Sequence, residues 1–374
     1  MSLSPRQVLY FVAALGMLAS LVAPLSSETA DAMLVRPAVA AAIVIAAALY
    51  VLAAFLNRSA AIAATFTGVL LGCWATLHLL NDPAVAGTAL WGFWLPVLAN
   101  WIAAWLGVAG LADLKLADKT LARAVNLAIP LVFGAFIFYL WEVTVRGFGV
   151  PSVLFPAPSA IAVRFAASLQ ILWEDFFQTF ILGVVTGYVI GCGAGFLTAV
   201  IAHRYTFLGR GLLPLGNFVS ALPIVGIAPI MVMWFGFDWQ SKAAVVVVIT
   251  FFPMLVNTLA GLNASGHIER DLMRSYAADH RQNLQKLYLP AAMPFIFNAL
   301  KINSTLAFIG AIVAEFFGTP TQGIGFRISI MAGRMALDTV WAEIALAALA
   351  GMAFYGLVAL AERATTFWHP SYRT

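Results

Sequence analysis

Long runs of apolar residues, separated by shorter polar segments, dominate the chain. A helix of roughly 20 apolar residues spans the hydrocarbon core of a bilayer, which is about 30 Å thick. Ten runs are long enough, near residues 8–26, 37–56, 60–80, 87–110, 124–144, 179–202, 212–236, 241–262, 293–316 and 339–361. The strict alternation expected of a lipid-facing β-barrel is absent from these runs. The pattern predicts an all-α polytopic membrane protein with about ten transmembrane helices.

The composition agrees with this prediction. Of the 374 residues, 63% are hydrophobic and 10% are charged, against roughly 45–50% and 25% in an average globular protein. So few charges cannot cover a surface that faces water, which excludes a secreted enzyme, a nucleic-acid-binding protein and a disordered scaffold. The first run could instead be a secretory signal with a cleavage site at Ala30-Asp31-Ala32. Its apolar region is longer than the typical signal, and further spans follow, so we expect a retained helix.

Basic residues orient the predicted spans. With the N-terminus inside, 13 of the 20 Lys and Arg residues fall in cytoplasmic segments and six fall outside, and Lys301 lies within a span. The bias predicts that both termini are cytoplasmic. The net charge of +4 therefore reports membrane topology and does not indicate a polyanionic partner.

Residues for metal, redox or nucleotide chemistry are sparse. Cys73 and Cys192 lie inside apolar runs, where cysteine is usually a small buried hydrophobe. The five histidines form no paired ligand motif, and no G-x-x-x-x-G-K-[ST] loop is present to hold nucleotide phosphates. We therefore expect a chain without catalytic residues, metal site or cofactor.

The texture of the chain changes near residue 118. The first four spans contain little polar character, and a charged amphipathic stretch follows them at 111–123. Beyond it, proline and glycine appear inside the spans, and the loops are longer. We expect an accessory region of four transmembrane helices over 1–118 and a six-helix functional core over 119–374.

The loop at 266–290 is about 25 residues long and mixed in charge. Ile268, Leu272 and Tyr276 recur every four residues, and a second stripe follows at Leu284, Leu287 and Tyr288. This spacing predicts short amphipathic helices, whose apolar faces need a cover. From the residues alone, docking on a partner protein and lying on the inner membrane surface are equally good explanations.

This loop resembles the EAA loop of ABC-importer permeases, whose pattern is E-A-A, three residues, G, nine residues and I-x-L-P. The stretch from Leu287 to Pro290 aligns with the exit, Ala277 takes the glycine position, and Asp271 keeps the acidic start. Alanine disfavours a positive φ at that position. The resemblance implies that the residues coupling the chain to an ATPase are Asp271, Arg274, Ser275, Ala277, Ala278, Asp279, Leu287, Leu289 and Pro290.

Other segments of the core are similar to the nitrate/sulfonate/taurine/bicarbonate branch of these permeases, and to the thiamine-pyrimidine permeases. They are 155–159, 220–236, 241–242, 251–261, 313–318 and the tail Trp368-His369-Pro370-Ser371. The resemblance covers roughly 124–374. It implies a type I ABC-importer permease core in the bacterial inner (plasma) membrane that moves a small polar solute by alternating access. The solute would be a sulfonate, nitrate, bicarbonate or a pyrimidine-like compound.

The same resemblance implies the partners. These are cytoplasmic ABC ATPase subunits that bind ATP and Mg²⁺, a second permease subunit of the same or a related kind, and a periplasmic substrate-binding protein. Nucleic acid is not expected as a partner.

Several residues are candidates for the translocation path. Proline removes a backbone donor and bends or breaks a membrane helix, and freed carbonyls are tolerated only inside protein or beside a wet cavity. Ionisable side chains at membrane depth are functional candidates, although Glu315 is expected near enough to the outer interface to be hydrated and Lys301 can snorkel inward. The candidates for the path or gate are Pro223, Pro229, Asn257, Asn303 and Glu315. Glycines at 183, 187, 191 and 195 are expected to allow close helix packing.

An ion-coupled secondary transporter without an ATPase is the alternative function. That class needs a carboxylate or histidine relay at the membrane centre, and only acids near the ends of spans are evident. A membrane-embedded enzyme has less support, because no His/Asp cluster or Ser/Cys constellation occurs.

Overall fold

The computed structural model describes residues 3–27, 33–114, 116, 118–220, 222–318 and 321–368. Within these ranges helices are the only extended regular elements, and one isolated bridge joins Ser26 and Ala89. The cleavage-like Ala30-Asp31-Ala32 and the tail residues His369, Pro370 and Ser371 lie outside the described residues. Contacts divide the chain into two compact units, Met1–Ile161 and Ala162–Thr374, each of which is treated by itself.

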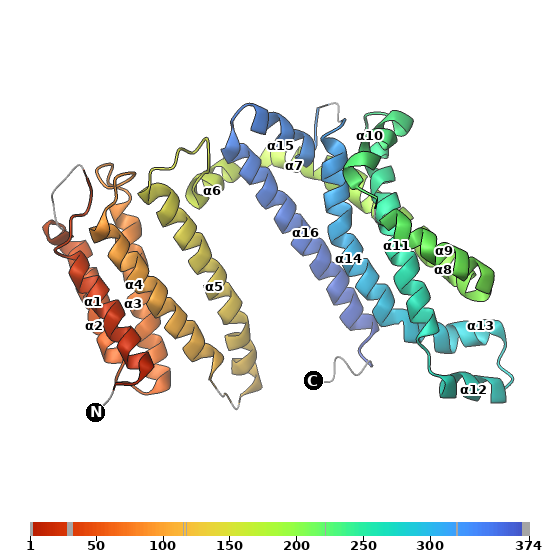
Figure 1. Cartoon of the computed structure of the whole chain (residues 1–374), viewed down its shortest axis with the longest axis horizontal. Coiled ribbons are helices and arrows are strands. Elements are labelled where there is room, and N and C mark those ends of the chain that lie inside the picture. The colour runs from red at the N-terminus through yellow and green to blue at the C-terminus, as the bar shows by residue number, and fades with distance from the viewer. Residues whose placement is uncertain are drawn as a thin grey trace. The chain divides into compact units, whose positions relative to one another are not determined.

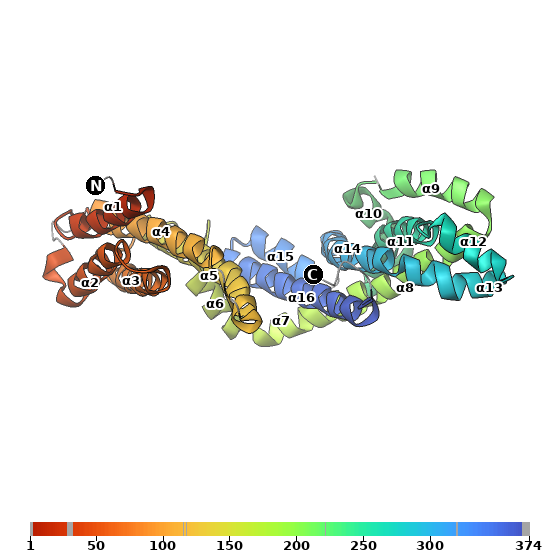
Figure 2. The same ribbon diagram turned by 90° about the horizontal axis from the view of Figure 1, so that it is seen from below.

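Unit 1 is a helical bundle (Figures 1 and 2). Side chains of Ser4, Asn57 and Asp118 accept hydrogen bonds from the first turns of α1, α3 and α5, and proline is the first residue of α1 and α2. Such caps satisfy backbone N–H groups that have no partner inside the helix. The helices are α1 (Pro5–Ser20), a short 3-10 turn η1 (Met33–Val35), α2 (Pro37–Ala53), α3 (Arg58–Leu79), α4 (Trp91–Ala112) and α5 (Lys119–Gly147).

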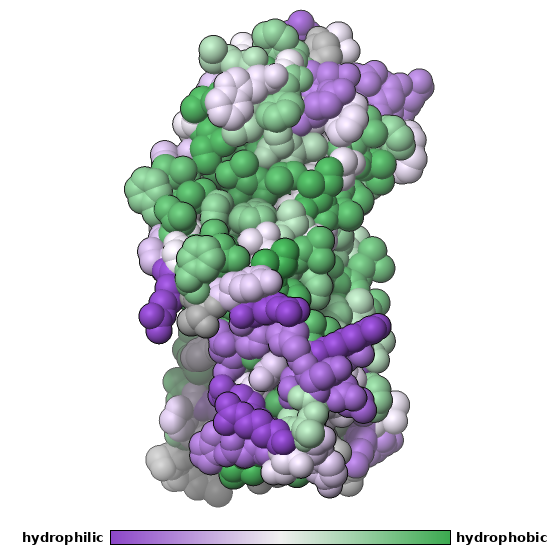
Figure 3. Space-filling model, turned by 90° about the vertical axis from the view of Figure 1, so that its right-hand side faces the viewer, coloured by the Kyte–Doolittle hydropathy of each residue, from purple (hydrophilic) through white to green (hydrophobic). Residues whose placement is uncertain are grey.

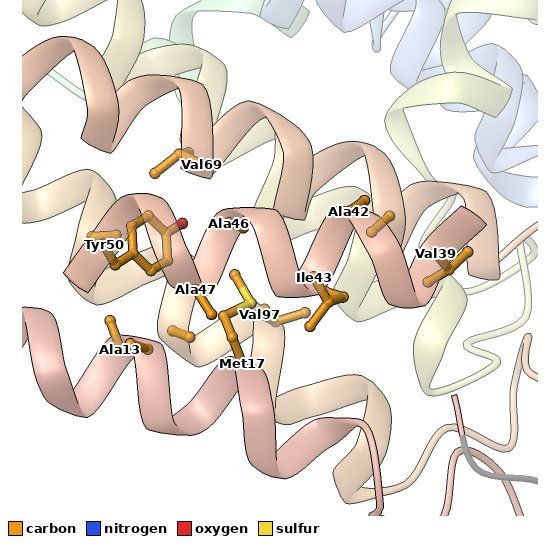
Figure 4. Packing of buried hydrophobic residues seen from close by; sticks show 14 of the residues in the cluster. Ala13, Met17, Val39, Ala42, Ile43, Ala46, Ala47, Tyr50, Val69 and Val97 are labelled. Atoms are coloured by element: carbon orange, nitrogen blue, oxygen red, sulfur yellow. The ribbon is translucent and has the colours of Figure 1, made fainter. Parts of the chain in front are cut away.

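Small side chains form the interior of unit 1. Figure 4 shows Ala46, Ala47 and Ile43 of α2 beside Met17 of α1 and Val97 of α4. Alanine at such contacts lets helix backbones approach closely in a bilayer. Buried hydrogen bonds reinforce the packing, among them one of 2.8 Å from the Tyr50 hydroxyl to the Asn100 carbonyl oxygen and one of 2.9 Å between the Thr76 and Tyr139 hydroxyls.

Unit 2 is built around α11 (Trp239–Asn263), which packs against α8, α9, α10 and α14. The chain enters through α6 (Pro158–Ala167), which crosses the division between the units. The other elements are α7 (Leu169–Phe176), the π-helical η2 (Phe177–Val185), α8 (Thr186–Arg204), α9 (Thr206–Ser220), α10 (Ile224–Phe235), α12 (His267–Ser275), α13 (His280–Asn283), the π-helical η3 (Leu284–Tyr288), α14 (Leu289–Glu315), α15 (Ile324–Gly333) and α16 (Leu337–Thr365).

The glycine stripe of α8 explains the closest of these contacts. A β-carbon placed on Gly187 would lie 2.5 Å from the Val246 Cβ, and one on Gly195 would lie 2.5 Å from the Phe251 carbonyl oxygen. No side chain fits there, so glycine is what allows α8 to lie against α11. The predicted packing role of this stripe is confirmed.

Seven helical segments of the described chain are long and apolar enough to cross a membrane. They are Arg58–Leu79, Trp91–Ala112, Lys119–Gly147, Leu169–Arg204, Trp239–Asn263, His280–Glu315 and Leu337–Thr365, and Pro37–Ala53, Ile224–Phe235 and Ile324–Gly333 are shorter apolar helices. The all-α polytopic class is therefore confirmed.

The predicted single span at 212–236 is wrong in detail. The structure has two helices there, α9 and α10, separated by a break that ends at Pro223. Proline lacks the N–H that would continue the helix and pushes the preceding residue, Leu222, towards extended backbone. Two adjacent helices take the place of one span.

The division by contacts at 161/162 places α5 with unit 1. The predicted boundary at 118/119 instead separates accessory helices from the helices that perform transport. The division by contacts does not test it, so it stays a prediction.

Candidate coupling loop and translocation path

The loop between α11 and α14 starts with the exposed helix α12. Gly266 is its N-terminal cap, and Arg270 turns back to donate a 2.7 Å hydrogen bond to the carbonyl oxygen of Ser265. Arg274 donates at 3.2 Å to the Asp271 carboxylate three residues earlier, while the Ser275 hydroxyl donates to the Asp271 carbonyl oxygen at 3.0 Å. These local bonds define α12 without help from another element.

The end of α12 is a Schellman turn with alanine at its key position. The N–H of Ala277 donates to the Arg274 carbonyl oxygen at 2.9 Å, and that of Ala278 donates to the Met273 carbonyl oxygen at 3.0 Å. Ala277, which aligns with the family glycine, has φ of 50°. Glycine is the usual residue there because it alone enters the left-handed region at little cost. The loop keeps a glycine-type turn although the glycine is missing.

The second half of the loop is fixed to unit 2. Asp279 caps α13 reciprocally with Gln282, through bonds of 2.7 and 3.0 Å. The ring of Tyr288 then lies edge-on to His203 at the end of α8, with 4.7 Å between centroids. Leu284, Tyr288 and Leu289 pack against the hydrophobic core of the unit, and Pro290 stands in the first turn of α14.

The two apolar stripes of the loop therefore have different surroundings. The second stripe is partly buried, whereas the first is open: Ile268 is 71% exposed, Leu272 55% and Tyr276 77%. Figure 3 shows a large group of hydrophilic residues at the lower end of this face, where α12 and α13 lie in Figure 1, and a smaller group at its upper end, with an apolar band between them. Nothing in the described chain covers the first stripe.

The break before α10 lies beside a small cavity of about 210 Å³. Residues on both sides of Pro223, together with parts of α11 and α14, line it; they are Val219, Leu222, Ile224, Ile227, Val248, Ile249, Pro253 and Leu306. Pro223 itself is exposed, and Pro229 lies inside α10. Non-helical backbone at membrane depth is tolerated where it is buried in protein or lines a cavity, and this break lies beside one.

The two candidate asparagines make different contacts. Asn257 donates a 2.8 Å hydrogen bond to the carbonyl oxygen of Pro253 on its own helix. Asn303 is fully buried, where its amide donates to the Thr250 carbonyl oxygen at 2.8 Å and reaches the Cys192 sulfur at 3.2 Å. Asn303 thus ties α14 to both α11 and α8.

Glu315 is not hydrated, contrary to expectation. It is 2% exposed, and its carboxylate accepts hydrogen bonds of 2.8 Å from the Thr179 hydroxyl and 2.7 Å from the Gly325 N–H. A β-carbon on Gly323 would lie 2.6 Å from the same carboxylate. The start of α15 covers Glu315 and excludes water from it. Nothing in the position of Glu315 near the end of its span indicated this cover.

Asp175 and Arg327 form a second buried centre beside Glu315. Arg327 donates to the Asp175 carboxylate through Nε at 2.7 Å and Nη2 at 3.1 Å, and the Gly323 N–H donates to the same carboxylate at 2.7 Å. Arg327 is thus engaged internally. The sequence interpretation passed over Asp175 because it precedes the predicted span, although an acid so close to an apolar run is itself a signal.

Lys301 and Glu362 pair across α14 and α16, with 2.8 Å between charged atoms. The pair is largely shielded, with side-chain exposures of 21% and 9%. The sequence suggested that Lys301 extends to the inner interface. In the structure it has an ionic partner inside the protein.

The comparisons with known proteins agree with this architecture. Residues 187–367 match the family described as binding-protein-dependent transport system inner membrane component. The formylaminopyrimidine transport permease protein ThiX of Halalkalibacterium halodurans is 28% identical over 246 residues, which cover 66% of this chain and 98% of that protein. The riboflavin transport system permease protein RibX of Chloroflexus aurantiacus is 29% identical over 256 residues, covering 67% and 91%. The putative aliphatic sulfonates transport permease protein SsuC of Bacillus subtilis is 28% identical over 246 residues, covering 65% and 88%.

The helical core and these similarities define a membrane permease that transports solutes. The core is similar to the ABC-importer permeases, and its relatives include sulfonate and formylaminopyrimidine permeases. The family match begins at residue 187, so α1–α7 lie outside it.

Proposed function

We propose that this chain is the membrane subunit of an ATP-driven importer that carries a small polar solute from periplasm to cytoplasm by alternating access. The observation that carries the proposal is the exposed apolar stripe of α12, presented by a helix whose own hydrogen bonds hold it in shape. An amphipathic helix with an uncovered face suits a groove on a partner protein. The similarity to binding-protein-dependent transport systems supports an ATPase subunit on the cytoplasmic side as this partner.

In this proposal α12 docks through Ile268, Leu272 and Tyr276, and the charges of Asp271 and Arg274 border the contact. The turn at Ala277 and the capping box at Asp279 pass movement of α12 to α13, and the continuous helix through η3 passes it to α14. ATP and Mg²⁺ bind to the separate ATPase subunit. Closure of that subunit then biases the core between outward-open and inward-open states.

The remaining assignments belong to the same proposal. The chain lies in the bacterial inner membrane with both termini cytoplasmic, works with a second permease subunit, and receives solute from a periplasmic binding protein. The path runs by the break at Pro223 and the cavity beside it, with Pro229, Asn257, Asn303 and Glu315 as path or gate residues. The names of the relatives favour a sulfonate, nitrate or pyrimidine-like solute, and the sequence resemblance adds bicarbonate.

The first test is reconstitution of the full chain with the ATPase and binding protein encoded beside it. Uptake should require ATP, and the ATPase should copurify with the permease. The variant Ile268→Ser/Leu272→Ser/Tyr276→Ser should abolish copurification and uptake while changing thermal unfolding little, because more than half of each side chain is exposed within the chain. Gln285→Ser, in the adjoining turn η3, is the matched exposed control and should retain both.

Charge on the loop offers an independent test. The double variant Asp271→Lys/Asp279→Lys should uncouple ATP hydrolysis from uptake. Asp271→Lys/Asp279→Ser keeps a side chain that can cap α13, so it isolates the effect of charge at Asp271. Normal uptake by the double lysine variant would refute the assigned coupling role. Uptake driven by an ion gradient without the ATPase would establish the ion-coupled alternative instead.

A further inference from the structure

Glu343 is a buried acid whose two carboxyl oxygens receive no hydrogen bond from the described part of the chain. It lies in the second turn of α16 and is 0% exposed. An ionised carboxylate held inside protein without a donor costs several kcal/mol, so such a group becomes neutral or acquires a partner. Its surroundings decide which of these applies.

Asp175 of α7 is the acid that faces Glu343, and α16, which carries Glu343, packs against both α7 and α15. Asp175 is also 0% exposed, but it has three donors: the Gly323 N–H and two nitrogens of Arg327. Three N–H donors favour the charged form of a carboxylate. They also engage Nε and Nη2 of Arg327, the positive side chain that faces Glu343 among the described residues.

Glu315, at the end of α14, is the third acid that faces Glu343. It accepts hydrogen bonds from Thr179 and Gly325, and the amine of Lys242 on α11, which also acts on Glu315, donates to the backbone carbonyl oxygens of Phe237 and Asp238. Among the described residues, the charged groups that face Glu343 from α7, α14 and α15 are thus two acids and one arginine, and that arginine is hydrogen-bonded to Asp175.

A metal cation does not fit as the missing partner. In the described residues no three His, Cys, Asp or Glu side chains are arranged to hold a metal ion. A proton balances the group with nothing further, because two adjoining carboxyl groups that hold one proton form a charge-assisted O–H···O⁻ hydrogen bond.

We propose that Glu343 and Asp175 form a proton-binding site, in which Glu343 carries the proton and donates it in a hydrogen bond to an oxygen of Asp175. The bond joins α16 to α7, and Arg327 and Gly323 extend the junction to α15. Loss of the proton to water leaves two facing carboxylates and loosens α16 from this junction. The site lies outside the coupling loop and does not depend on the proposed role of the ATPase.

The test measures thermal unfolding of the purified full chain over a range of pH. Because the folded state would hold a proton that the unfolded state releases, the folding equilibrium constant should fall by about tenfold per pH unit between the pH at which this glutamate titrates in the unfolded chain and the pH at which it titrates in the folded chain. Glu343→Gln retains an N–H donor, so it should match the wild type at acidic pH and lose this dependence. Glu343→Ala should be less stable than Glu343→Gln throughout, and the neighbouring control Glu174→Gln should keep the wild-type dependence.

Infrared spectra supply a second readout. The wild type should show the C=O band of a protonated carboxylic acid at neutral pH, and this band should be reduced in Glu343→Gln. An unchanged pH dependence in Glu343→Gln would overturn the proposal. So would failure of that variant to fold, because the amide mimics the neutral acid. Stabilisation of the wild type by Na⁺ at constant pH, absent from Glu343→Gln, would also overturn it and assign the site to a cation.

Discussion

Replacing Ala277 with glycine should strengthen the turn that joins α12 to α13. Alanine in the left-handed region costs about 1–2 kcal/mol, which glycine does not incur. The greater conformational freedom of glycine stabilises the open state of the turn and so offsets roughly 0.5–1 kcal/mol of this gain. The difference favours the closed turn in Ala277→Gly by about 0.5–1 kcal/mol, which corresponds to roughly a two- to fivefold change in its opening equilibrium.

Amide hydrogen exchange of the purified chain measures that equilibrium directly. The N–H groups of Ala277 and Ala278 donate the two bonds that close the turn. Exchange at Ala278 should therefore slow about two- to fivefold in Ala277→Gly. Ala278→Gly is the matched control, since Ala278 does not have a positive φ. With no strain to relieve, that variant should exchange faster in the surrounding turn.

The reasoning fails if Ala277→Gly exchanges as fast as the wild type or faster, or if both glycine variants change exchange in the same direction. Ala277→Val extends the series, because a β-branched residue is disfavoured more strongly at positive φ. It should open the turn and, under the proposed function, lower ATP-driven uptake.

Three further predictions concern other parts of the chain. Gly191→Ala should lower stability by about 1–3 kcal/mol in thermal unfolding, because its β-carbon would lie 2.1 Å from a threonine hydroxyl of α11; Gly193→Ala, with nothing within 4 Å, should be nearly neutral. Lys301→Met should cost about 2–3 kcal/mol by leaving the shielded carboxylate of Glu362 unpaired, and adding Glu362→Gln should recover most of that loss. The N–H of Ala84 donates a hydrogen bond to the Asp82 carboxylate and lowers its pKa, and the guanidinium of Arg36, which pairs with Asp82, lowers this pKa further. Its contribution to stability is therefore present above the unfolded pKa of about 3.9 and lost as pH falls through the folded value, and Asp82→Asn should flatten that acid limb in thermal unfolding.

Apolar run length and residue spacing predict much of this fold. The helices follow the runs because a bilayer requires backbone hydrogen bonds to be satisfied within each segment. The glycines of α8 predicted a close helix contact, because residues four positions apart lie on one face of a helix. The stripe at Ile268, Leu272 and Tyr276 predicted an amphipathic helix, which is α12. All these features depend on residues a few positions apart.

Features that depend on residues far apart were not predictable in this way. Asp175 and Glu343 are separated by 168 positions, and nothing in either local pattern indicates that they meet. Glu315 stands near the end of its helix, where hydration is the default expectation, and only the return of α15 buries it. The break at Pro223 was predicted only in part. Proline predicted a distortion of the helix, but the separation of the segment into α9 and α10 depends on the neighbours of α10.

The unbroken helix from α13 through η3 to α14 has a mechanical consequence. It bends at the π-helical η3, where α13 turns away from the line of α14 (Figure 1). α14 runs from Leu289 to Glu315, 27 residues, which at 1.5 Å per residue is a rod of about 40 Å. If this rod pivots at one end, a tilt of about 10° displaces the other end by roughly 7 Å. Under the proposed coupling role, a small tilt imposed beside the loop would therefore reach Glu315 as a large displacement, with no relay of side chains needed in between.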